Sequence, residues 1–208
     1  MIIKDIRSAL DALMRGSIVA LPTDTFYSLS VVYDNLQGLE RLVELKEADN
    51  PLLLLIPSLS HLELVTRDIH PLWLKWLDMV WPSAITFLFP AREDLLPIIT
   101  LSTNKVGVRV PDNTDLLNLL YMLNKPVTGT SANPQGLPPA STSRQVQAYF
   151  PELEYILEFD RINNTAIDNE VEPSTLVDLT IYPPHIIRHG KVIWELLPDI
   201  PPFPLTKE

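Results

Sequence analysis

Apolar residues recur along the chain at the spacing of amphipathic helices, and short apolar runs separate these segments. Residues 4–15 place Ile6, Leu10 and Leu13 on one side of a helix that would end near Gly16. Similar helices are predicted at residues 35–48, 70–82, 112–123 and 143–150. The apolar or alternating runs predict strands at residues 17–22, 51–57, 84–90, 105–111, 174–180 and 185–190, with a further strand end within 126–131.

Helices and strands alternate through much of the chain, which predicts an α/β fold. The last two predicted strands follow one another without a helix, so we expect antiparallel members in a mixed sheet. Polar loops at the strand ends are expected to line one cleft. We expect residues 1–195 to form one domain and the proline-rich residues 196–208 to form an extended or polyproline tail.

The composition limits the classes of protein that need to be considered. The chain has 208 residues with 46% hydrophobic residues, which is enough for a sizeable core. Its net charge of −10 and the lack of a basic run disfavour stable binding of nucleic acid by the chain alone. It contains no cysteine, and its longest apolar run, 52–57, is far shorter than a membrane span. We therefore expect a cytoplasmic protein without membrane association.

The stretch LPTDTFYSL, residues 21–29, follows a predicted buried strand and contains Thr23, Asp24 and Thr25. Such residues commonly form turns and helix caps. Alternatively, their hydroxyl groups could line a site and form hydrogen bonds with a polar ligand. The local sequence leaves both interpretations open.

Two further stretches could bind an anion. In VGVRVPDN, residues 106–113, the valines share one strand face and Arg109 lies on the other. This arginine is either an exposed surface residue or a bidentate ligand for phosphate or carboxylate. In GTSAN, residues 129–133, hydroxyl, amide and backbone N–H groups could form an anion-binding nest or a plain surface loop.

Other common catalytic motifs are missing from the sequence. No GK[ST] follows the glycines, so the chain has no Walker A loop. The four histidines show no metal-type spacing, and the carboxylates form no evident pair. We therefore predict neither a resident metal site nor a catalytic nucleophile supplied by the protein.

Seven stretches together resemble one family. They are LPTDTFYSL, LKEADNPLLLL, WPSAITFLF, VGVRVPDN, TSANPQGLPP, PSTLVDLT and IIRHGKV, and they occur in the family's order across residues 16–193. The chain resembles YrdC-like proteins, the threonylcarbamoyl-adenylate synthases of tRNA modification. The resemblance implies a YrdC-like α/β fold: a twisted mixed sheet with flanking helices and an open, positively charged central cleft.

The resemblance also implies a reaction. L-threonine, bicarbonate and ATP would give L-threonylcarbamoyl-adenylate and pyrophosphate, for transfer by a partner to adenosine 37 of tRNA. The carbamate of threonine would be the nucleophile, so the protein would mainly position reactants and stabilise charge. Mg²⁺ would enter with ATP and be held largely by phosphate oxygens. Contact with tRNA would be weak or indirect, and other tRNA-modification proteins could be partners.

The family's ligand residues map onto particular positions of this chain. Thr25 and Ser174 would contact threonine, and Arg109 would face the substrates. Lys46 matches the lysine that opens the family's K-x-R-x-x-x-K-P motif. The implied substrate-binding residues are Thr25, Lys46, Arg109, Ser131 and Ser174. The implied nucleotide-binding residues are Lys46, Asn133, Ser141 and Arg188.

The chain departs from the family pattern after Lys46. Ala48 stands where the family has arginine, and Asn50 stands where it has a second lysine. The loss of two charge-assisted contacts would weaken ATP binding by about two to four decades. The cations that could replace them are Arg41, Arg92, Lys105 and Arg144.

These departures leave two alternatives to synthase activity. A divergent family member could bind a nucleotide or RNA without making the adenylate. An interaction protein could instead use the fold as a scaffold, with the proline-rich tail as its contact surface.

Overall fold

The computed structural model describes residues 1–47, 50–67, 69–159 and 172–206. The helices among them are α1 (Ile6–Met14), α2 (Leu36–Lys46), α3 (Pro71–Val80), α4 (Pro97–Thr100), α5 (Thr114–Leu123) and α6 (Ser143–Tyr149). Short 3₁₀ helices span Leu59–Leu64 and Trp194–Leu196. The four long predicted helices and the predicted helix at 143–150 are confirmed, each slightly shortened.

The strands form two mixed sheets, whereas the sequence predicted one. The first sheet has the order β1 (Ile2–Ile3), β9 (Tyr155–Leu157), β2 (Val19–Pro22), β3 (Tyr27–Ser30) and β8 (Thr130–Ser131). The second has the order β11 (His185–Arg188), β10 (Thr175–Asp178), β5 (Ile85–Pro90), β6 (Lys105–Arg109), β4 (Leu54–Leu55) and β7 (Val127–Thr128). The fold is therefore mixed α/β, as expected, with the strands divided between two sheets.

The chain passes from one sheet to the other at Gly129. The preceding strand, β7, pairs with β4, and the following strand, β8, pairs with β3. A Cβ atom at Gly129 would lie 2.6 Å from Leu53 Cδ1 and 2.8 Å from Leu55 Cγ. Glycine is required here because any side chain would collide with these leucines. The segment predicted as one strand end is thus two short strands.

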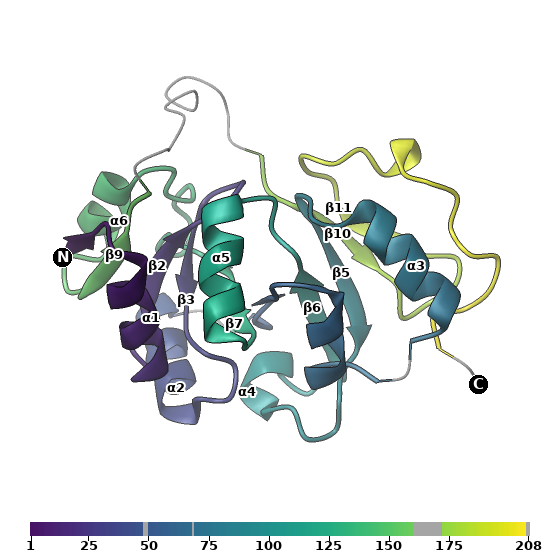
Figure 1. Cartoon of the computed structure of the whole chain (residues 1–208), viewed down its shortest axis with the longest axis horizontal. Helices are drawn as coiled ribbons and strands as arrows, with labels where there is room; N and C mark the ends of the chain where they lie inside the picture. The colour runs from purple at the N-terminus through teal and green to yellow at the C-terminus, as the bar shows by residue number, and fades with distance from the viewer. Residues whose placement is uncertain (48–49, 68, 160–171, 207–208) are drawn as a thin grey trace.

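Helix caps explain where several helices begin. Asp5 accepts hydrogen bonds from two backbone N–H groups of α1, and Asn35 and Asn113 cap α2 and α5. Thr142 begins α6 with a capping box completed by Gln145. Figure 1 shows α1 beside β2, α5 at the centre of the view, and α3 beside β5, β10 and β11. The helices thereby cover the sheets and leave the loops between the sheets for the site.

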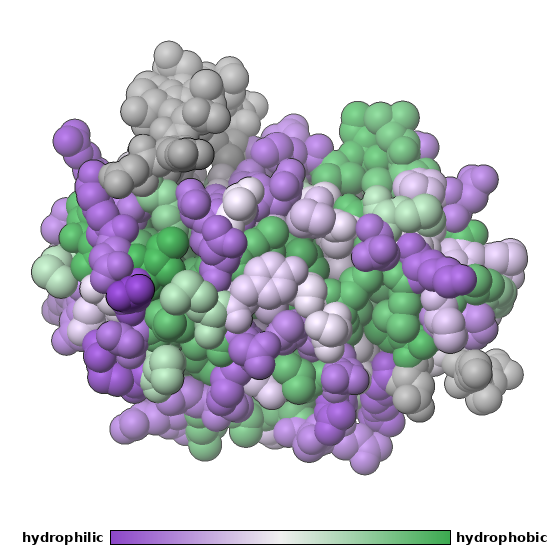
Figure 2. Space-filling model, viewed as in Figure 1, coloured by the Kyte–Doolittle hydropathy of each residue, from purple (hydrophilic) through white to green (hydrophobic). Residues whose placement is uncertain are grey.

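The core on the second sheet is rich in aromatic residues. Trp76 is 1% exposed, and its ring lies near those of Trp73, Phe87 and Trp194. Outside this core, polar and charged residues are interspersed with apolar ones over the face drawn in Figure 2. No helix among the described residues is long and apolar enough to cross a membrane.

The proline-rich tail packs on α3 as far as residue 206. The indole N–H of Trp73 donates to the carbonyl oxygen of Phe203 at 3.0 Å, and that of Trp76 donates to Pro198 at 2.9 Å. The backbone N–H of His70 donates to Leu205, whose side chain is 2% exposed. Buried indole N–H groups need such acceptors, which explains why the extended tail packs along α3.

Trp76→Ala should lower the free energy of unfolding by about 3–5 kcal/mol, because it leaves a cavity and removes a tail contact. Met79→Ala, on the same helix at a residue that is 64% exposed, should change it by about 0.5 kcal/mol or less. Urea unfolding of both variants measures the difference. Equal effects of the two substitutions would contradict the packing described for α3 and the tail.

Candidate functional site

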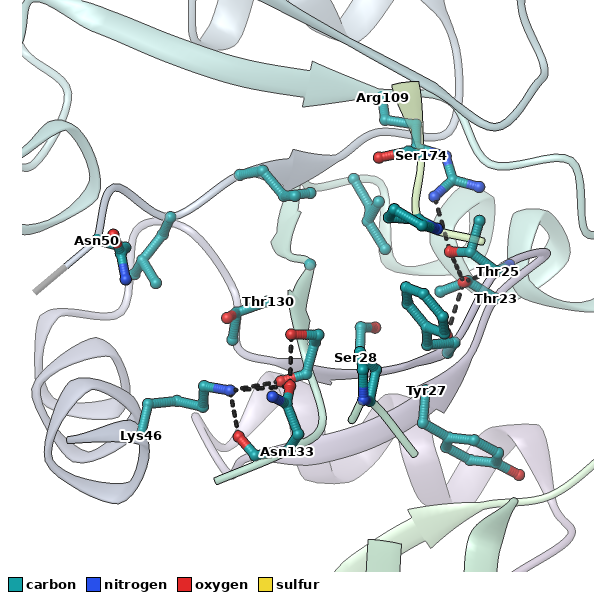
Figure 3. A pocket seen from close by; sticks show the side chains of 18 of the residues that line it. Thr23, Thr25, Tyr27, Ser28, Lys46, Asn50, Arg109, Thr130, Asn133 and Ser174 are labelled. Atoms are coloured by element: carbon teal, nitrogen blue, oxygen red, sulfur yellow. Dashed lines mark hydrogen bonds between the residues drawn. The ribbon is translucent and has the colours of Figure 1, made fainter. Parts of the chain in front are cut away.

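A cavity of about 550 Å³ lies between loops contributed by the two sheets. Its lining comes from the β2–β3 loop, the end of α2, β6, the segment after β8, residues 173–174 and the end of β11. Figure 3 shows Lys46 and Asn133 on one side and Arg109, Ser174 and Thr25 on the other. The volume is typical of a small-molecule site.

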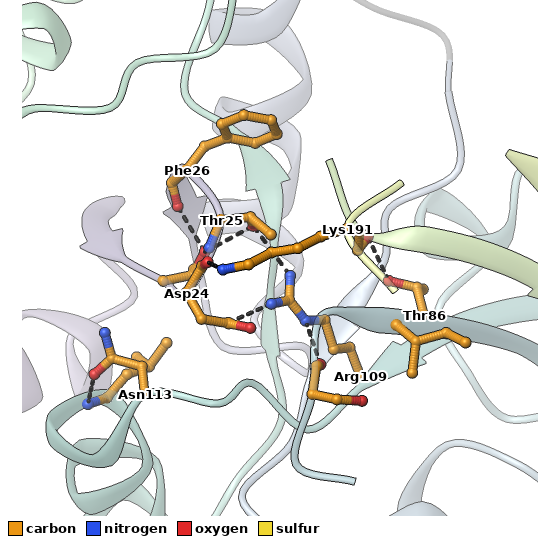
Figure 4. A network of polar contacts seen from close by, with 12 residues as sticks. Asp24, Thr25, Phe26, Thr86, Arg109, Asn113 and Lys191 are labelled. Carbon is orange, nitrogen blue, oxygen red and sulfur yellow. Dashed lines mark hydrogen bonds and ion pairs between the residues drawn. The ribbon is translucent and has the colours of Figure 1, made fainter. Parts of the chain in front are cut away.

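Arg109 joins the second sheet to the β2–β3 loop. One guanidinium nitrogen, Nη2, is ion-paired with the carboxylate of Asp24, while Nη1 donates to Thr25 Oγ1 at 3.1 Å. Its Nε donates to the carbonyl oxygen of Ser83 at 3.1 Å. Arg109 is 4% exposed, and burial lowers its pKa. The paired carboxylate offsets this burial and fixes the direction of the guanidinium (Figure 4).

The loop around Thr25 has its own hydrogen bonds. Thr23 Oγ1 accepts from the backbone N–H of Thr25 at 3.0 Å and donates to the carbonyl oxygen of Phe26 at 2.7 Å. The two threonine hydroxyls lie 3.0 Å apart. The turn interpretation of this stretch is confirmed, and the turn places its hydroxyl groups in the lining of the cavity. Hydrogen bonding of these hydroxyls to a ligand stays a prediction.

Lys46 ends α2 and reaches the loop after β8. Its Nζ donates to the carbonyl oxygens of Ser131 at 2.7 Å and Asn133 at 2.5 Å. Removal from water disfavours the charged amine and lowers the Lys46 pKa to about 8. An anion placed beside this amine would favour its charged form.

The TSAN loop is held in a defined shape by its own side chains. Ser131 Oγ donates to Asn133 Oδ1 at 2.6 Å, and Asn133 Nδ2 donates to the carbonyl oxygen of Leu137 at 2.7 Å. Gly136 adopts a φ of +81°, which favours glycine, and lines the cavity. The loop lies in the cavity lining, and Asn133 also accepts hydrogen bonds from Lys46 Nζ. Its role as an anion-holding loop stays a prediction.

Ser174 and Arg188 form the opposite wall. Arg188 Nε and Nη2 donate to the carbonyl oxygen of Ser174 at 3.1 and 2.9 Å, and Nη2 also approaches Ser174 Oγ at 3.2 Å. Thr86 Oγ1 lies 2.9 Å from the same hydroxyl. Partial burial and the positive charge of Arg109 lower the pKa of Arg188. The guanidinium groups of Arg109 and Arg188 therefore repel each other at this wall.

The charge of the lining is opposite to that of the chain. Lys46, Arg109 and Arg188 line the cavity, and no aspartate or glutamate is among the described residues of the lining. The whole chain carries a net charge of −10. Asp24, outside the lining, pairs with Arg109, so the positive charge that favours an anionic ligand comes mainly from Lys46 and Arg188.

The structure brings together most of the residues proposed from the sequence. Those that line the cavity are Thr25, Lys46, Arg109, Ser131, Asn133, Ser174 and Arg188. Ser141 is not part of the lining, and its backbone N–H and hydroxyl donate to Gln145 Oε1 beside the start of α6. Its role in nucleotide binding stays a prediction.

None of the four replacement cations proposed from the sequence lines the cavity. Arg41 donates to the carbonyl oxygen of Gly16, Arg92 pairs with Asp94, and Lys105 pairs with Asp178. Arg144 is exposed on α6. The sequence named these cations only as available replacements, because sequence distance does not report which partner a flexible cation finds in three dimensions.

Other lining residues were not assigned from the sequence. Asn50, considered only as a lost cation, lies in the lining together with Thr23, Ser28 and Gln135. Position 48, the other departure, lies outside the described residues. Asp24 was noted only as a turn residue. A buried arginine in a strand needs a carboxylate partner, and this requirement was the available signal for Asp24.

Among the described residues, no group of three or more histidine, cysteine, aspartate or glutamate side chains could hold a metal ion. Hydroxyl and carbonyl oxygens are nevertheless present in the lining. A divalent cation in this cavity would therefore take most of its ligands from a bound anion.

The family model described as "Telomere recombination", named Sua5/YciO/YrdC, matches residues 11–190. The chain belongs to the Sua5/YciO/YrdC family. This match includes every proposed site residue, from Thr25 to Arg188.

Two curated relatives and one solved structure are similar to much of this chain. The threonylcarbamoyl-AMP synthase of Pyrococcus abyssi is 31% identical, over 89% of this chain and 54% of the relative, so the chain spans about half of that protein's length. That of Photobacterium profundum is 31% identical over 74% of this chain and 86% of the relative. The crystal structure of Pyrococcus abyssi Sua5 complexed with L-threonine has a TM-score of 0.79 and 28% identity, covering 91% of this chain and 57% of that one.

In this Sua5/YciO/YrdC member, the ε-carbon signal of Lys46 should titrate with a midpoint of about 8 in the free protein. Sulfate, a divalent anion, should move this midpoint upward because it favours the charged amine. Accordingly, anion affinity should be highest below pH of about 8 and fall as Lys46 loses its proton. Lysine-labelled NMR measures the titration, and Lys46→Met assigns the signal. A midpoint that sulfate leaves unchanged would show that no anion binds beside Lys46.

Proposed function

We propose that this chain is an L-threonylcarbamoyladenylate synthase, which forms threonylcarbamoyl-AMP and pyrophosphate from ATP, L-threonine and bicarbonate. The observation that carries the proposal is the cavity with three cations and no described carboxylate in its lining. The names of the curated relatives and the threonine-bound Sua5 structure support the choice of reaction.

The polyphosphate of ATP occupies the side of the cavity formed by Lys46 and the TSAN loop. The Lys46 amine and the hydroxyl groups of Thr130 and Ser131 are the donors available there. Two carbonyl oxygens already hold the lysine in place, so ATP meets an amine whose position is fixed before binding. Such preorganisation reduces the entropy lost on binding.

Threonine occupies the opposite side, between Thr25, Arg109 and Ser174. The hydroxyls of Thr25 and Ser174 provide hydrogen-bonding groups, and Arg109 provides positive charge for the carboxylate. Arg188 lies beside Ser174 and near Arg109, where its charge also acts on the phosphate that reacts. The two reactants thus approach each other over the middle of the cavity.

The chemistry needs no nucleophile from the protein. The threonine amine adds to bicarbonate-derived carbon and gives a carbamate with loss of water. A carbamate oxygen then forms a bond to the α-phosphorus of ATP, while the bond from that phosphorus to the bridging oxygen of pyrophosphate breaks. The leaving pyrophosphate carries the electron pair and negative charge. Lys46 and Arg188 stabilise this charge, and the loops hold the reacting atoms in line.

Mg²⁺ enters as part of the ATP complex and keeps phosphate oxygens as its main ligands. The lining supplies hydroxyl and carbonyl groups to this complex and no described carboxylate. This donor set agrees with a metal that arrives with its substrate.

The product supplies the threonylcarbamoyl group for position 37 of tRNA, after transfer by a partner enzyme. A net charge of −10 opposes direct binding of tRNA, so contact with tRNA is weak or passes through other tRNA-modification proteins. We place this reaction in the cytoplasm, where its substrates and tRNA are available.

The changes after Lys46 favour one alternative, a family member that binds nucleotide or RNA without synthase activity. Asn50 brings no charge to the lining, and none of the four alternative cations replaces the missing one. A scaffold role has less support, because the tail that would provide its contact is bonded to α3. Turnover that depends on threonine separates the synthase from a protein that only binds nucleotide.

The deciding experiment measures pyrophosphate release with ATP–Mg²⁺, L-threonine and bicarbonate. A synthase releases pyrophosphate only when threonine and bicarbonate are both present. Calorimetric binding of ATP without threonine-dependent release would instead establish the nucleotide-binding alternative. If ATP does not bind and no pyrophosphate is released, both synthase activity and ATP binding are excluded for this cavity.

Arg188→Met should lower kcat/KM for this release by about ten- to a hundredfold, because a charge-assisted contact is lost while the apolar stem remains. Arg144→Met, on the exposed surface of α6, serves as the matched control and should leave the rate within about twofold. A comparable loss in both variants would mean that Arg188 acts through general charge and not within the cavity.

A further inference from the structure

We propose that Lys191 is a positioning residue that sets the spacing between the two loops of the threonine subsite. Its backbone N–H donates to the carbonyl oxygen of Pro173 at 2.9 Å. Its side-chain Nζ donates to the carbonyl oxygen of Asp24, also at 2.9 Å. Lys191 thus bonds to two residues, Pro173 and Asp24, which directly precede Ser174 and Thr25 in the chain. This inference rests on the proposed function for the identity of the substrate.

The backbone around Lys191 is tightly fixed against the Ser174 loop. A Cβ atom at Gly190 would lie 2.2 Å from the carbonyl oxygen of Pro173, so only glycine allows the two segments to lie this close. On the other side, Thr175 Oγ1 donates to the carbonyl oxygen of Val192 at 2.6 Å. Lys191 therefore extends from a base that cannot shift independently of Ser174.

The far end of Lys191 meets a loop that belongs to the other sheet. Asp24 uses its carboxylate to pair with Arg109 and its backbone carbonyl oxygen to accept from Lys191 (Figure 4). Arg109 and Lys191 both come from the second sheet and its continuation, whereas Asp24 follows β2 of the first. Two cations thus hold the same residue, one through its side chain and one through its backbone.

Lys191 acts through these neighbours and not by contact with the ligand. It is exposed, and it is absent from the lining of the cavity. The proposed phosphate side is formed by Lys46 and the TSAN loop, whereas the hydrogen bonds of Lys191 go to Asp24 and Pro173. Loss of the Lys191 amine should therefore disturb the Thr25–Ser174 spacing and leave the phosphate side unchanged.

The test compares Lys191→Met with wild type in the pyrophosphate release assay. The substitution keeps the backbone N–H bond to Pro173 and removes only the bond to Asp24. We expect the KM for threonine to rise about three- to tenfold, the net size of one ordinary hydrogen bond, because Lys191 is exposed and acts indirectly. The KM for ATP and kcat should stay within about twofold. Lys191→Arg, which can still donate, should restore most of the threonine KM.

Lys125→Met is the matched control. It removes an exposed ion pair with Asp34, 2.6 Å between Lys125 Nζ and the carboxylate, away from the cavity lining. It should leave both KM values within about twofold. An unchanged threonine KM in Lys191→Met would overturn the inference, and so would a fall in kcat alone, which would instead place the amine at the reacting atoms.

Amide hydrogen exchange without substrates tests the same claim independently of the reaction. The backbone N–H groups of Thr23 and Thr25 are bonded within the loop, so loosening of the loop should make them exchange faster in Lys191→Met than in Lys125→Met. Faster exchange together with an inactive wild-type protein would disprove the proposed function and keep Lys191 as a loop-positioning residue. Unchanged exchange would overturn the positioning role whatever the activity.

Discussion

The buried ion pair between Arg109 and Asp24 is the constraint on which the site depends. Arg109 leaves β6 of the second sheet, and Asp24 lies in the loop after β2 of the first. Both side chains are at least nine-tenths buried, so each charge needs the other, and removal of either leaves a costly unpaired ion. Because the pair joins the sheets beside the cavity, it also fixes Thr25, whose hydroxyl accepts from the same guanidinium. The fold and the site are therefore stabilised by the same contact.

The cavity concentrates positive charge within an acidic protein. A net charge of −10 repels nucleic acid at long range, while Lys46 and Arg188 give the lining a local positive charge. Burial lowers the pKa values of Lys46, Arg109 and Arg188, and the charge of Arg109 lowers that of Arg188 further. A negatively charged ligand beside these cations would favour their charged forms.

The departures after Lys46 leave Lys46 as the one cation on its side of the cavity among the described residues. Asn50 keeps a polar group in the lining but brings no charge, and the other arginines and lysines suggested as replacements are engaged elsewhere. The wall with Thr25 and Ser174, by contrast, has a contact from outside the cavity, because Lys191 bonds to both of its loops.

The sequence by itself determined the α/β class and the main helices, because periodicity is a local property. Its resemblance to the family named most of the proposed residues that line the cavity. It also indicated that Arg109 and the TSAN loop could serve an anion. Only the tertiary structure decided that the strands form two sheets, since Gly129 permits a close approach that no local pattern encodes. The same holds for the partners of long charged side chains. Arg109 finds Asp24 across 85 positions and Lys191 finds it across 167, distances over which sequence spacing carries no geometric information.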